Sequence, residues 1–403
     1  MTIPPSAPAY ASNEARTEWT AAEAGLIDRA RALVPALRER AARAEELRRI
    51  PAETHAAFRD AGFFRVFQPA RYGGLEARYG LHTMLAAETA RGCPSSAWAL
   101  SVTACHAWIL GMFPRLAQDE FWGDDPARAV ASSFLAVGPK LAPESGGIRL
   151  SGRWRFSSNV DHCDGAILLA MAPGGAPQFL LVHRSQYQIE DTWRSVGLAA
   201  SGSNDIVIAD ALVPPHRMLD VAATRDGSAP GAEANQSQLF RLPLFACLPH
   251  SLVGAALGAA LGAVDQIVAD LGGRTSVASV RLAEQQTIQA RIAEAAAELE
   301  AARALLQVDR ARIADLARAR ELPDDATRMQ LRLNVGYAAK LCVQAVERLM
   351  PVVGGRGLEL HNSFQRAWRD IHAVAQHIAL VWDVQALNYA AQRLGLASGD
   401  PKI

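Results

Sequence analysis

The segment Arg281–Arg318 constrains the fold most, because it contains no Gly or Pro and repeats Ala, Glu, Arg and Leu throughout. This composition favours one uninterrupted helix, and a helix of that length must pack lengthwise against others to bury its apolar positions. Asp325–Met350 continues in the same style. The chain from about 242 to 394 is therefore long enough for a bundle of four helices.

Two zones of different character precede this one. From about 17 to 122, helical patterns alternate with short breaks, and 95–113 is apolar enough for a buried helix. From about 129 to 226, short β-branched and apolar runs separated by Gly, Pro and Asp are typical of antiparallel strands. The runs are Ala129–Leu135, Gly147–Ser157, Ala166–Ala172, Phe179–His183 and Asp205–Leu212. We predict an α+β fold with a helical domain at 14–124, a β domain at 125–226 and a helical bundle at 237–395.

Composition argues against several classes of protein. The 403 residues include 41 Lys or Arg and 41 Asp or Glu, and this balance disfavours a nucleic-acid binder. The five Cys form no C-x-x-C pair, so neither a disulfide framework nor a zinc site is indicated. The apolar stretch Phe245–Ala263 is interrupted by Pro249, His250 and several Gly, which disfavours a membrane span. Without a signal-peptide pattern at the N-terminus, we expect a soluble cytoplasmic protein.

Histidines and glycine-rich loops supply the candidates for chemistry. His106 lies inside the apolar segment Ala97–Phe113, where an imidazole is either a hydrogen-bonded core residue or faces a cavity. His372 and His377 are five residues apart on one predicted helix and do not face one metal, so no metal site is expected. The loop Gly197–Asn204 is small and hydroxyl-rich, and is either a generic loop or a place where backbone N–H groups approach a flat or phosphorylated ligand. No G-x-S-x-G elbow supports a hydrolase.

Six short motifs occur in an order that resembles one known family. They are Pro69-x-x-Tyr-Gly-Gly74, Arg91-Gly-Cys-Pro-Ser-Ser-Ala-Trp98, Leu150-Ser-Gly-x-Trp-x-Phe-Ser-Ser158, Trp193-x-x-x-Gly-Leu-x-x-Ser-Gly-Ser203, Val213-Pro-Pro215 and Arg369-Asp-x-His372. Together they resemble the flavin-dependent monooxygenases that share the acyl-CoA dehydrogenase fold. The chain is most similar to the two-component aromatic hydroxylases of group D, such as the oxygenase components of 4-hydroxyphenylacetate and steroid-ring phenol hydroxylases.

This resemblance implies an N-terminal helical domain, a central β-barrel domain and a C-terminal four-helix bundle, assembled into a homotetramer. It also implies an oxygenase that takes reduced FMN or FAD from a separate NAD(P)H-dependent reductase. Oxygen would add at flavin C4a to give a hydroperoxide, which would hydroxylate a small phenol-like substrate. Two alternatives stay open: a nitrogen or sulfur monooxygenase of the same fold, and an acyl-CoA dehydrogenase or oxidase.

The segment after Arg369-Asp370 argues against the dehydrogenase. In many acyl-CoA dehydrogenases the catalytic base is a glutamate in a Tyr-Glu-Gly-Thr segment of this region. Aligned without gaps, that glutamate falls at Ile378 and the tyrosine at His377. An isoleucine cannot remove a proton, so the base that α-proton abstraction requires is missing at this position. A histidine near the reactive edge of the flavin is what the monooxygenases have here, and His377 provides it.

The resemblance also assigns roles to single residues. Ser158 matches the serine that hydrogen-bonds flavin N5, but the following glycine of the family is Asn159 here, so the donor could instead be Ser157. His106 matches a histidine beside the substrate hydroxyl, where it would act as the base that deprotonates a phenol. The expected catalytic residues are thus His106, Ser158 and His377.

Further residues are expected to line the site. The substrate would also contact Trp108, Phe134, Phe156 and His372, although core packing is the plainer explanation for the aromatic residues. Flavin would be held by Ser157, Ser158, Ser201, Gly202, Ser203 and His377, with Arg274, Gly354 and Gly355 nearer its phosphate or a neighbouring subunit's flavin.

Overall fold

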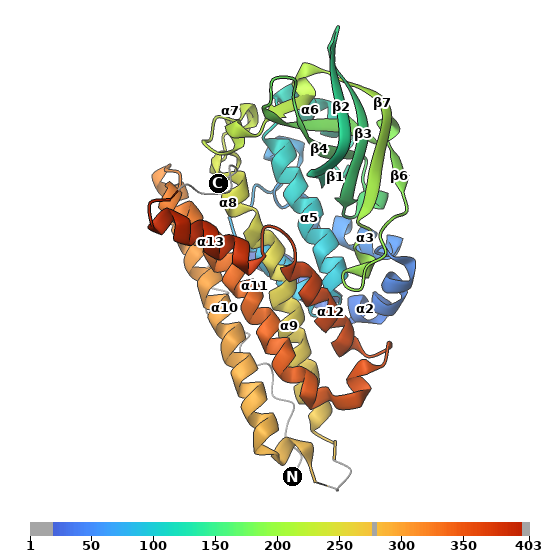
Figure 1. Ribbon diagram of the computed structural model, residues 1–403, viewed down its shortest axis with the longest axis vertical. Coiled ribbons are helices and arrows are strands. Elements are labelled where there is room, and N and C mark those ends of the chain that lie inside the picture. The colour runs from blue at the N-terminus through green and yellow to red at the C-terminus, as the bar shows by residue number, and fades with distance from the viewer. Residues whose placement is uncertain (1–18, 276–279, 397–403) are drawn as a thin grey trace.

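The computed structural model describes residues 19–275 and 280–396, so the first residues of the N-terminal domain predicted from residue 14 lie outside the described part. The order of helical, β and helical zones is as predicted (Figure 1). The first zone contains α2 (Ala21–Leu47), α3 (Ala52–Asp60), the short turns η1 (Phe63–Arg65) and η2 (Ala70–Tyr72), α4 (Leu81–Ala90), α5 (Pro94–Gly111) and α6 (Arg115–Trp122).

Helix α5 is the central element of this zone. Pro94 occupies its first turn, where proline lacks no hydrogen bond that the helix needs. Every residue from Pro94 to Gly111 is buried, as the apolar sequence predicted. The helix therefore runs through the middle of the molecule, and polar side chains on it must find partners inside the protein.

The β zone consists of two four-stranded sheets. One has the order β1 (Val130–Ser133), β4 (Gly165–Met171), β5 (Pro177–His183) and β8 (Met218–Asp220); the other has the order β2 (Leu135–Glu144), β3 (Gly147–Ser157), β7 (Asn204–Val213) and β6 (Gln188–Glu190). Leu150 and Trp154 of β3 pack with Leu168 and Leu180 of the other sheet in a shared core. The other strand pairs are antiparallel, as predicted, but β1 runs parallel to β4.

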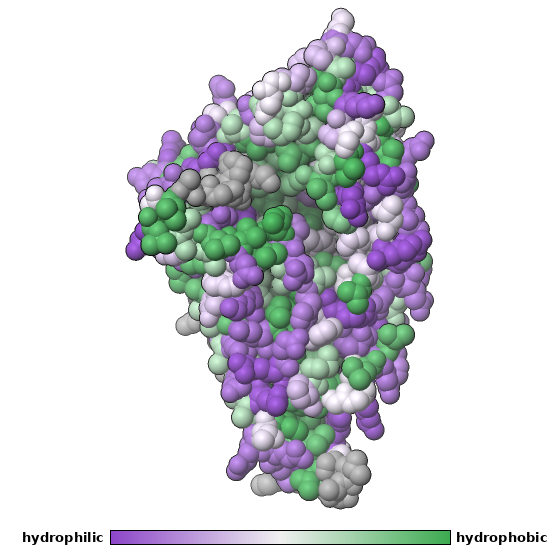
Figure 2. Space-filling model, in the orientation of Figure 1, coloured by the Kyte–Doolittle hydropathy of each residue, from purple (hydrophilic) through white to green (hydrophobic). Residues whose placement is uncertain are grey.

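The last zone contains α7 (Pro230–Asn235), α8 (Leu244–Cys247), α9 (Pro249–Leu271), α10 (Gln286–Ala319), α11 (Asp325–Val353), the turn η10 (Gly354–Leu358), α12 (Ser363–Ala375) and α13 (Trp382–Arg393). Helix α11 packs against α9, α10, α12 and α13, which gives the bundle its shape (Figure 1). The long helix predicted from residue 281 begins at Gln286 instead. On the outside, apolar side chains gather over α13 and the segments beside it (Figure 2). They include Ile378, Leu387, Leu394 and Leu396.

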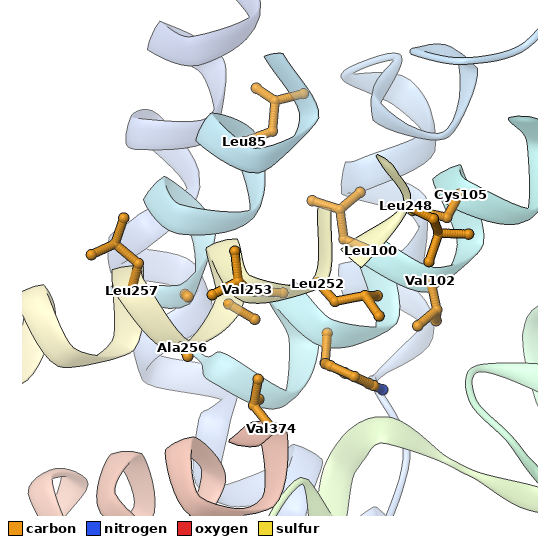
Figure 3. Packing of buried hydrophobic residues seen from close by; sticks show 14 of the residues in the cluster. Leu85, Leu100, Val102, Cys105, Leu248, Leu252, Val253, Ala256, Leu257 and Val374 are labelled. Carbon is orange, nitrogen blue, oxygen red and sulfur yellow. The ribbon is translucent and has the colours of Figure 1, made fainter. Parts of the chain in front are cut away.

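Three glycines let α9 lie directly on α4. A Cβ atom at Gly254 would be 2.5 Å from the carbonyl oxygen of Thr83, and one at Gly258 would be 1.8 Å from that of Ala87. One at Gly262 would be 2.9 Å from the Cα atom of Arg91. These glycines are part of the small-residue pattern that disfavoured a membrane span. Leu244–Leu271 is long and apolar enough to cross a membrane, but it packs in the core, where Leu252, Val253 and Leu257 meet Leu85, Leu100 and Val374 (Figure 3).

Candidate active site around Trp98

Three hydroxyl groups from two segments form a chain next to Trp98. Trp98 Nε1–H donates to Ser158 Oγ at 3.1 Å, Ser158 Oγ lies 2.7 Å from Ser203 Oγ, and Ser203 Oγ lies 2.7 Å from Ser201 Oγ. All four residues are buried. Ser158 directly follows β3, whereas Ser201 and Ser203 belong to the glycine-rich loop that leads into β7. The structure thus brings together the serines that the sequence placed at one site.

The hydroxyl chain retains one hydrogen for a ligand. Three hydroxyl groups carry three hydrogens, and the two bonds between them use only two. Since Trp98 can only donate, the remaining hydrogen has no partner among the described residues. Either end of the chain can provide it, because both bonds can reverse their direction together. Ser158 can therefore donate to a ligand or accept from one.

The backbone around Ser158 bends because two residues adopt left-handed conformations. Phe156 has φ 64° and Asn159 has φ 59°, and the pairing of β3 with β7 shifts between Trp154 and Ser157. Asparagine tolerates this conformation better than most residues other than glycine, so Asn159 fits the place where the resemblance expects glycine.

Asn159 also anchors the loop. Its N–H donates to Ser201 O at 2.8 Å and its Nδ2 donates to Thr103 Oγ1 of α5 at 2.9 Å. These bonds hold the Ser158 segment against the Ser201 loop and against the helix that carries Trp98 and His106. Ser157, the alternative donor, is fully buried, and its Oγ has no hydrogen-bond partner among the described residues.

His377 follows α12 and faces Trp98. The two rings contact edge to face with centroids 5.4 Å apart, and Ala379 N–H donates to His377 Nδ1 at 3.3 Å. Burial lowers the pKa of His377 to about 4, helped by the positive charge of Arg332, so its imidazole is neutral at physiological pH. The neighbouring Ile378, where a dehydrogenase would carry its base, is 64% exposed.

His106 lies two turns beyond Trp98 on α5, in a fixed tautomer. Its Nδ1 lies 3.1 Å from the carbonyl oxygen of Val130, which only accepts, so Nδ1 carries the hydrogen. In the neutral ring Nε2 is then an acceptor, and Ser132 Oγ donates to it at 2.7 Å. Both ring nitrogens of His106 therefore have hydrogen-bond partners inside the protein.

The surroundings of His106 make it a weak base. Burial lowers its pKa to about 3, only partly offset by the bond to Val130. No carboxylate among the described residues bonds to the ring to stabilise a positive charge. His106 is therefore better suited to accept a hydrogen bond than to take a proton completely.

Four expected substrate contacts lie in different surroundings. Trp108 is fully buried, contacts Phe67 and donates to Leu239 O at 2.9 Å, as a core residue does. Phe134 follows β1, close to Ser132, and packs against Phe179 with centroids 5.2 Å apart. Phe156 is 47% exposed and contacts Trp193 edge to face. His372 donates from Nδ1 to Trp368 O and places Nε2 2.9 Å from Glu347, on the side of α12 that faces α11.

The expected phosphate-binding residues form a separate group. Arg274, in the loop after α9, donates to Val353 O at 3.4 Å, directly before Gly354 and Gly355. This group lies at the end of the bundle that is distant from the β zone (Figure 1). A Cβ atom at Gly355 would meet nothing within 4 Å, so the surface there is open. Within one chain, these residues do not reach the serine cluster.

Gly202, by contrast, lies between Ser201 and Ser203 in a left-handed conformation with φ 60°. A Cβ atom at this position would lie 3.3 Å from Asp161 Oδ2 and 3.3 Å from Arg49 Cβ, so the loop fits closely over the segment after Asn159. Glycine therefore suits this position for its conformational freedom.

Sequence reasoning missed three residues that the structure places here. Trp98 was part of a recognised motif but was given no role, although it contacts both Ser158 and His377. Ser132 was not considered, because nothing in a single strand indicates which helix it faces. Asn159 was noted only as a departure from the family. Among the described residues, no group of three or more His, Cys, Asp or Glu side chains could hold a metal ion.

The residues present fit a flavin ring. The spare hydrogen of the hydroxyl chain can pair with a ring nitrogen, the half-exposed Phe156 and the Trp98–His377 pair offer flat apolar faces, and Gly202 allows close approach of the backbone. A group that is flat, largely apolar and edged with hydrogen-bonding atoms is what such a lining accommodates.

Comparison with known proteins agrees with this geometry. The chain matches the family models "Acyl-CoA dehydrogenase, N-terminal domain" over residues 20–125 and "Acyl-CoA dehydrogenase, C-terminal domain" over residues 250–382, which confirms the predicted fold class. It is 37% identical over 388 residues to the FADH2-dependent resorcinol hydroxylase, oxygenase component, of Rhizobium sp. (strain MTP-10005), covering 92% of this chain and 94% of that protein.

Two solved structures are also similar. One is the 3-HSA hydroxylase from Rhodococcus sp. RHA1, with a TM-score of 0.90 and 31% identity over 94% of this chain and 99% of that one. The other is XiaF from Streptomyces sp. in complex with FADH2 and glycerol, with a TM-score of 0.88 and 27% identity over 97% of this chain and 100% of that one.

Proposed function

This chain belongs to the flavin-dependent monooxygenases that share the acyl-CoA dehydrogenase fold, and from that premise we propose that it is the oxygenase component of a two-component system that hydroxylates a small phenol-like aromatic substrate. Reduced flavin, FMNH2 or FADH2, would supply the electrons that activate O2. The similar resorcinol hydroxylase is FADH2-dependent and XiaF is seen with FADH2, which supports reduced FAD in particular.

The serine cluster and its neighbours would hold the flavin. Ser158 would hydrogen-bond to the ring at N5. Ser203 and Ser201, which continue the hydroxyl chain, would orient the hydrogen of Ser158. The rings of Trp98 and His377 would cover the site and exclude water. His377, neutral because its pKa is lowered, adds no charge to this apolar surface.

His106 and Ser132 would bind the substrate, and this pair is the observation that favours a phenol. Ser132 Oγ–H donates to His106 Nε2 and keeps a lone pair with which Ser132 can accept the O–H of a phenol. Drawing the phenol hydrogen toward Ser132 and His106 raises the electron density of the ring at the ortho carbon. Because a buried imidazolium is unstable here, the pair polarises the phenol and does not ionise it fully.

The runner-up functions lack such an observation. A sulfide has no hydrogen to donate to Ser132, an amine gains no ring activation from such a bond, and the exposed Ile378 offers no base to an acyl-CoA dehydrogenase. Arg274, Gly354 and Gly355 lie far from the serine cluster of their own chain, and apolar residues cover the outer face of α13 (Figure 2). Both facts support a homotetramer in which this group contacts a neighbouring subunit's flavin. The burial of α9 in the core supports a soluble protein.

The proposal is tested by reconstitution. The purified chain is incubated with resorcinol, FAD, NADH and an unrelated NADH-dependent flavin reductase, and the hydroxylated product is measured by mass spectrometry with ¹⁸O2. We expect one labelled oxygen atom in the product, and no product when the reductase is omitted. Rapid NADH consumption by the chain alone would contradict the two-component assignment. Oxidation of thiophenes or amines, with no phenol hydroxylated, would favour the heteroatom monooxygenase.

A further inference from the structure

A cavity of about 260 Å³ lies behind His106, apart from the serine cluster. It is enclosed by the end of α3, the turn η1, the helix α5 and the segment that enters β1. Thr103 and Ala107 form its wall on α5, on either side of His106 in the sequence. Val130, the residue whose carbonyl fixes the tautomer of His106, also lines it.

The floor of this cavity is apolar and its mouth is positively charged. Buried Phe64, Ala107, Ala129 and Val130 form most of the floor. Lining residues with charge are three arginines, Arg59, Arg65 and Arg128, and a single carboxylate, Asp60. The lining therefore has an excess of two positive charges, which favours a negatively charged ligand.

The arginines differ in how they are engaged. Arg59 Nε already donates to Asp60 at 3.0 Å. Arg128 Nη1 donates to Phe121 O at 3.0 Å, which fixes its guanidinium, and its other N–H groups have no partner in the described part of the chain. Arg65 has no side-chain partner among the described residues, and it is exposed. Two guanidinium groups at the mouth can thus pair with a carboxylate, for which their planar geometry is suited.

The floor also offers one acceptor. Both Nε2 hydrogens of Gln68 are used, by Tyr72 O at 3.2 Å and by Pro126 O at 3.0 Å. Its amide oxygen has no partner among the described residues, and Gln68 is buried. The hydroxyl of Thr103 is already engaged with Ala99 and Asn159. A ligand that reaches the floor can therefore donate a hydroxyl hydrogen to Gln68.

From these observations we propose that the cavity is a second binding site, separate from the flavin site, for a small aromatic carboxylate such as a hydroxybenzoate. Its ring would lie against Phe64 and Val130, with the carboxylate at Arg65 and Arg128. Because Val130 both lines the cavity and accepts from His106, occupancy of this site is expected to change the turnover of a phenol at the other side of His106 without competing with it.

Binding is tested first, and it does not depend on the proposed function. The full-length protein without flavin is titrated with 4-hydroxybenzoate by calorimetry, next to the neutral 4-hydroxybenzamide. We expect the carboxylate to bind and the amide to bind at least about 10-fold more weakly. Arg65→Met and Arg128→Met should each weaken the carboxylate by about 10-fold or more, since each removes a charged hydrogen-bond donor. Arg115→Met, which removes an exposed arginine outside the cavity, is the matched control and should change nothing.

Three results of the binding experiment would overturn the site. They are no measurable binding of 4-hydroxybenzoate, equal binding of the amide, and binding that survives both cavity variants but is lost in Ser132→Ala. The last result would place the ligand at the substrate side of His106. In the reconstituted reaction, competitive inhibition of resorcinol by 4-hydroxybenzoate would overturn it as well, whereas a change in kcat that disappears in Arg65→Met supports it. Circular dichroism of each variant checks that the fold is retained.

Discussion

The bond between Asn159 and Thr103 gives the sharpest test of how the site is positioned. Asn159→Gly removes the donor but keeps a residue that accepts φ 59° without strain. The loss of one buried neutral hydrogen bond costs about 0.5–1.5 kcal/mol, and the freedom of glycine in the unfolded chain adds up to about 1 kcal/mol. Thr103→Val removes the acceptor and leaves the Nδ2 of Asn159 buried without a partner, which costs about 1–3 kcal/mol.

Both changes should loosen Ser158 in the same way. We expect each to raise the ratio of hydrogen peroxide to hydroxylated product about five-fold or more, since about 1 kcal/mol of lost restraint corresponds to that factor. The double variant should be little worse than the more severe single one, because both remove the same bond. The assay measures product, hydrogen peroxide and NADH in the reconstituted reaction, with urea unfolding in parallel.

Thr89→Val is the matched control for these variants. Thr89 is also fully buried and also bonds back to its own helix, at 2.8 Å to Leu85 O, but it lies on α4 and touches no site residue. It should lower stability without changing the ratio of peroxide to product. Unchanged coupling in Asn159→Gly and Thr103→Val, or fully additive effects of the two, would refute the positioning role of this bond.

Four other predictions concern the site and the core. Ser158→Ala should raise peroxide release about ten-fold, and Ser157→Ala much less; the opposite order in a peroxide assay would show that Ser157 holds the flavin. His106→Ala should slow phenol hydroxylation by about 5- to 150-fold with flavin binding retained, because the loss of a buried hydrogen-bond acceptor costs about 1–3 kcal/mol. Because the pKa of His106 is lowered to about 3, the parent rate should show no inflection from this group between about pH 5 and 8; an inflection near 6.5 that is lost in the variant would contradict this. Burial lowers the pKa of His82 to about 4, below the value of about 6.5 in the unfolded chain. The unfolded state therefore binds more protons than the folded state as the pH falls. Because of His82, the free energy of unfolding should be about 2 kcal/mol lower at pH 5. A His82→Leu variant whose urea midpoint falls as much as the parent's between pH 7 and pH 5 would refute this prediction.

The parts of the fold that follow from local pattern were predictable. The uninterrupted composition before Arg318 gave α10, and the end of β3 at Ser157 was placed correctly because the alternation of the strand stops there. Strand β2 was missed, since it is an exposed edge strand that contains Pro139 and Pro143, and proline argues against a strand unless its edge is free. The parallel pairing of β1 with β4 depends on tertiary contacts that no single segment encodes.

The sequence predicted which residues lie together better than it predicted the properties of each one. The order of the motifs identified Ser158, Ser203 and His377, which the structure does gather around Trp98. The role of Trp98 could not be predicted, because the sequence of an apolar helix does not indicate which residues of other segments its indole contacts. The low pKa of His106 depends on complete burial and on the absence of a carboxylate partner, and both are properties of the folded molecule.

The Arg369-Asp370 pair shows why such separated motifs occur together. Asp370 Oδ1 accepts from Leu198 N–H at 2.6 Å and its Oδ2 accepts from Ser95 Oγ–H at 2.8 Å, so one buried carboxylate joins α12, the glycine-rich loop and the start of α5. Gly197 completes the joint, because a Cβ atom there would lie 2.1 Å from the carbonyl oxygen of Arg369.

Each of the three joined segments carries a member of the site. Trp98 lies one turn after Ser95, Ser201 and Ser203 follow Leu198, and His377 follows α12. Burial raises the pKa of Asp370 to about 6, because a carboxylate placed where three segments meet is removed from water. The two hydrogen bonds from Ser95 and Leu198 offset part of the cost of burying this carboxyl group. Asp370 thus holds together the segments that carry the indole, Ser201, Ser203 and the imidazole, while Asn159 ties the Ser158 segment to them.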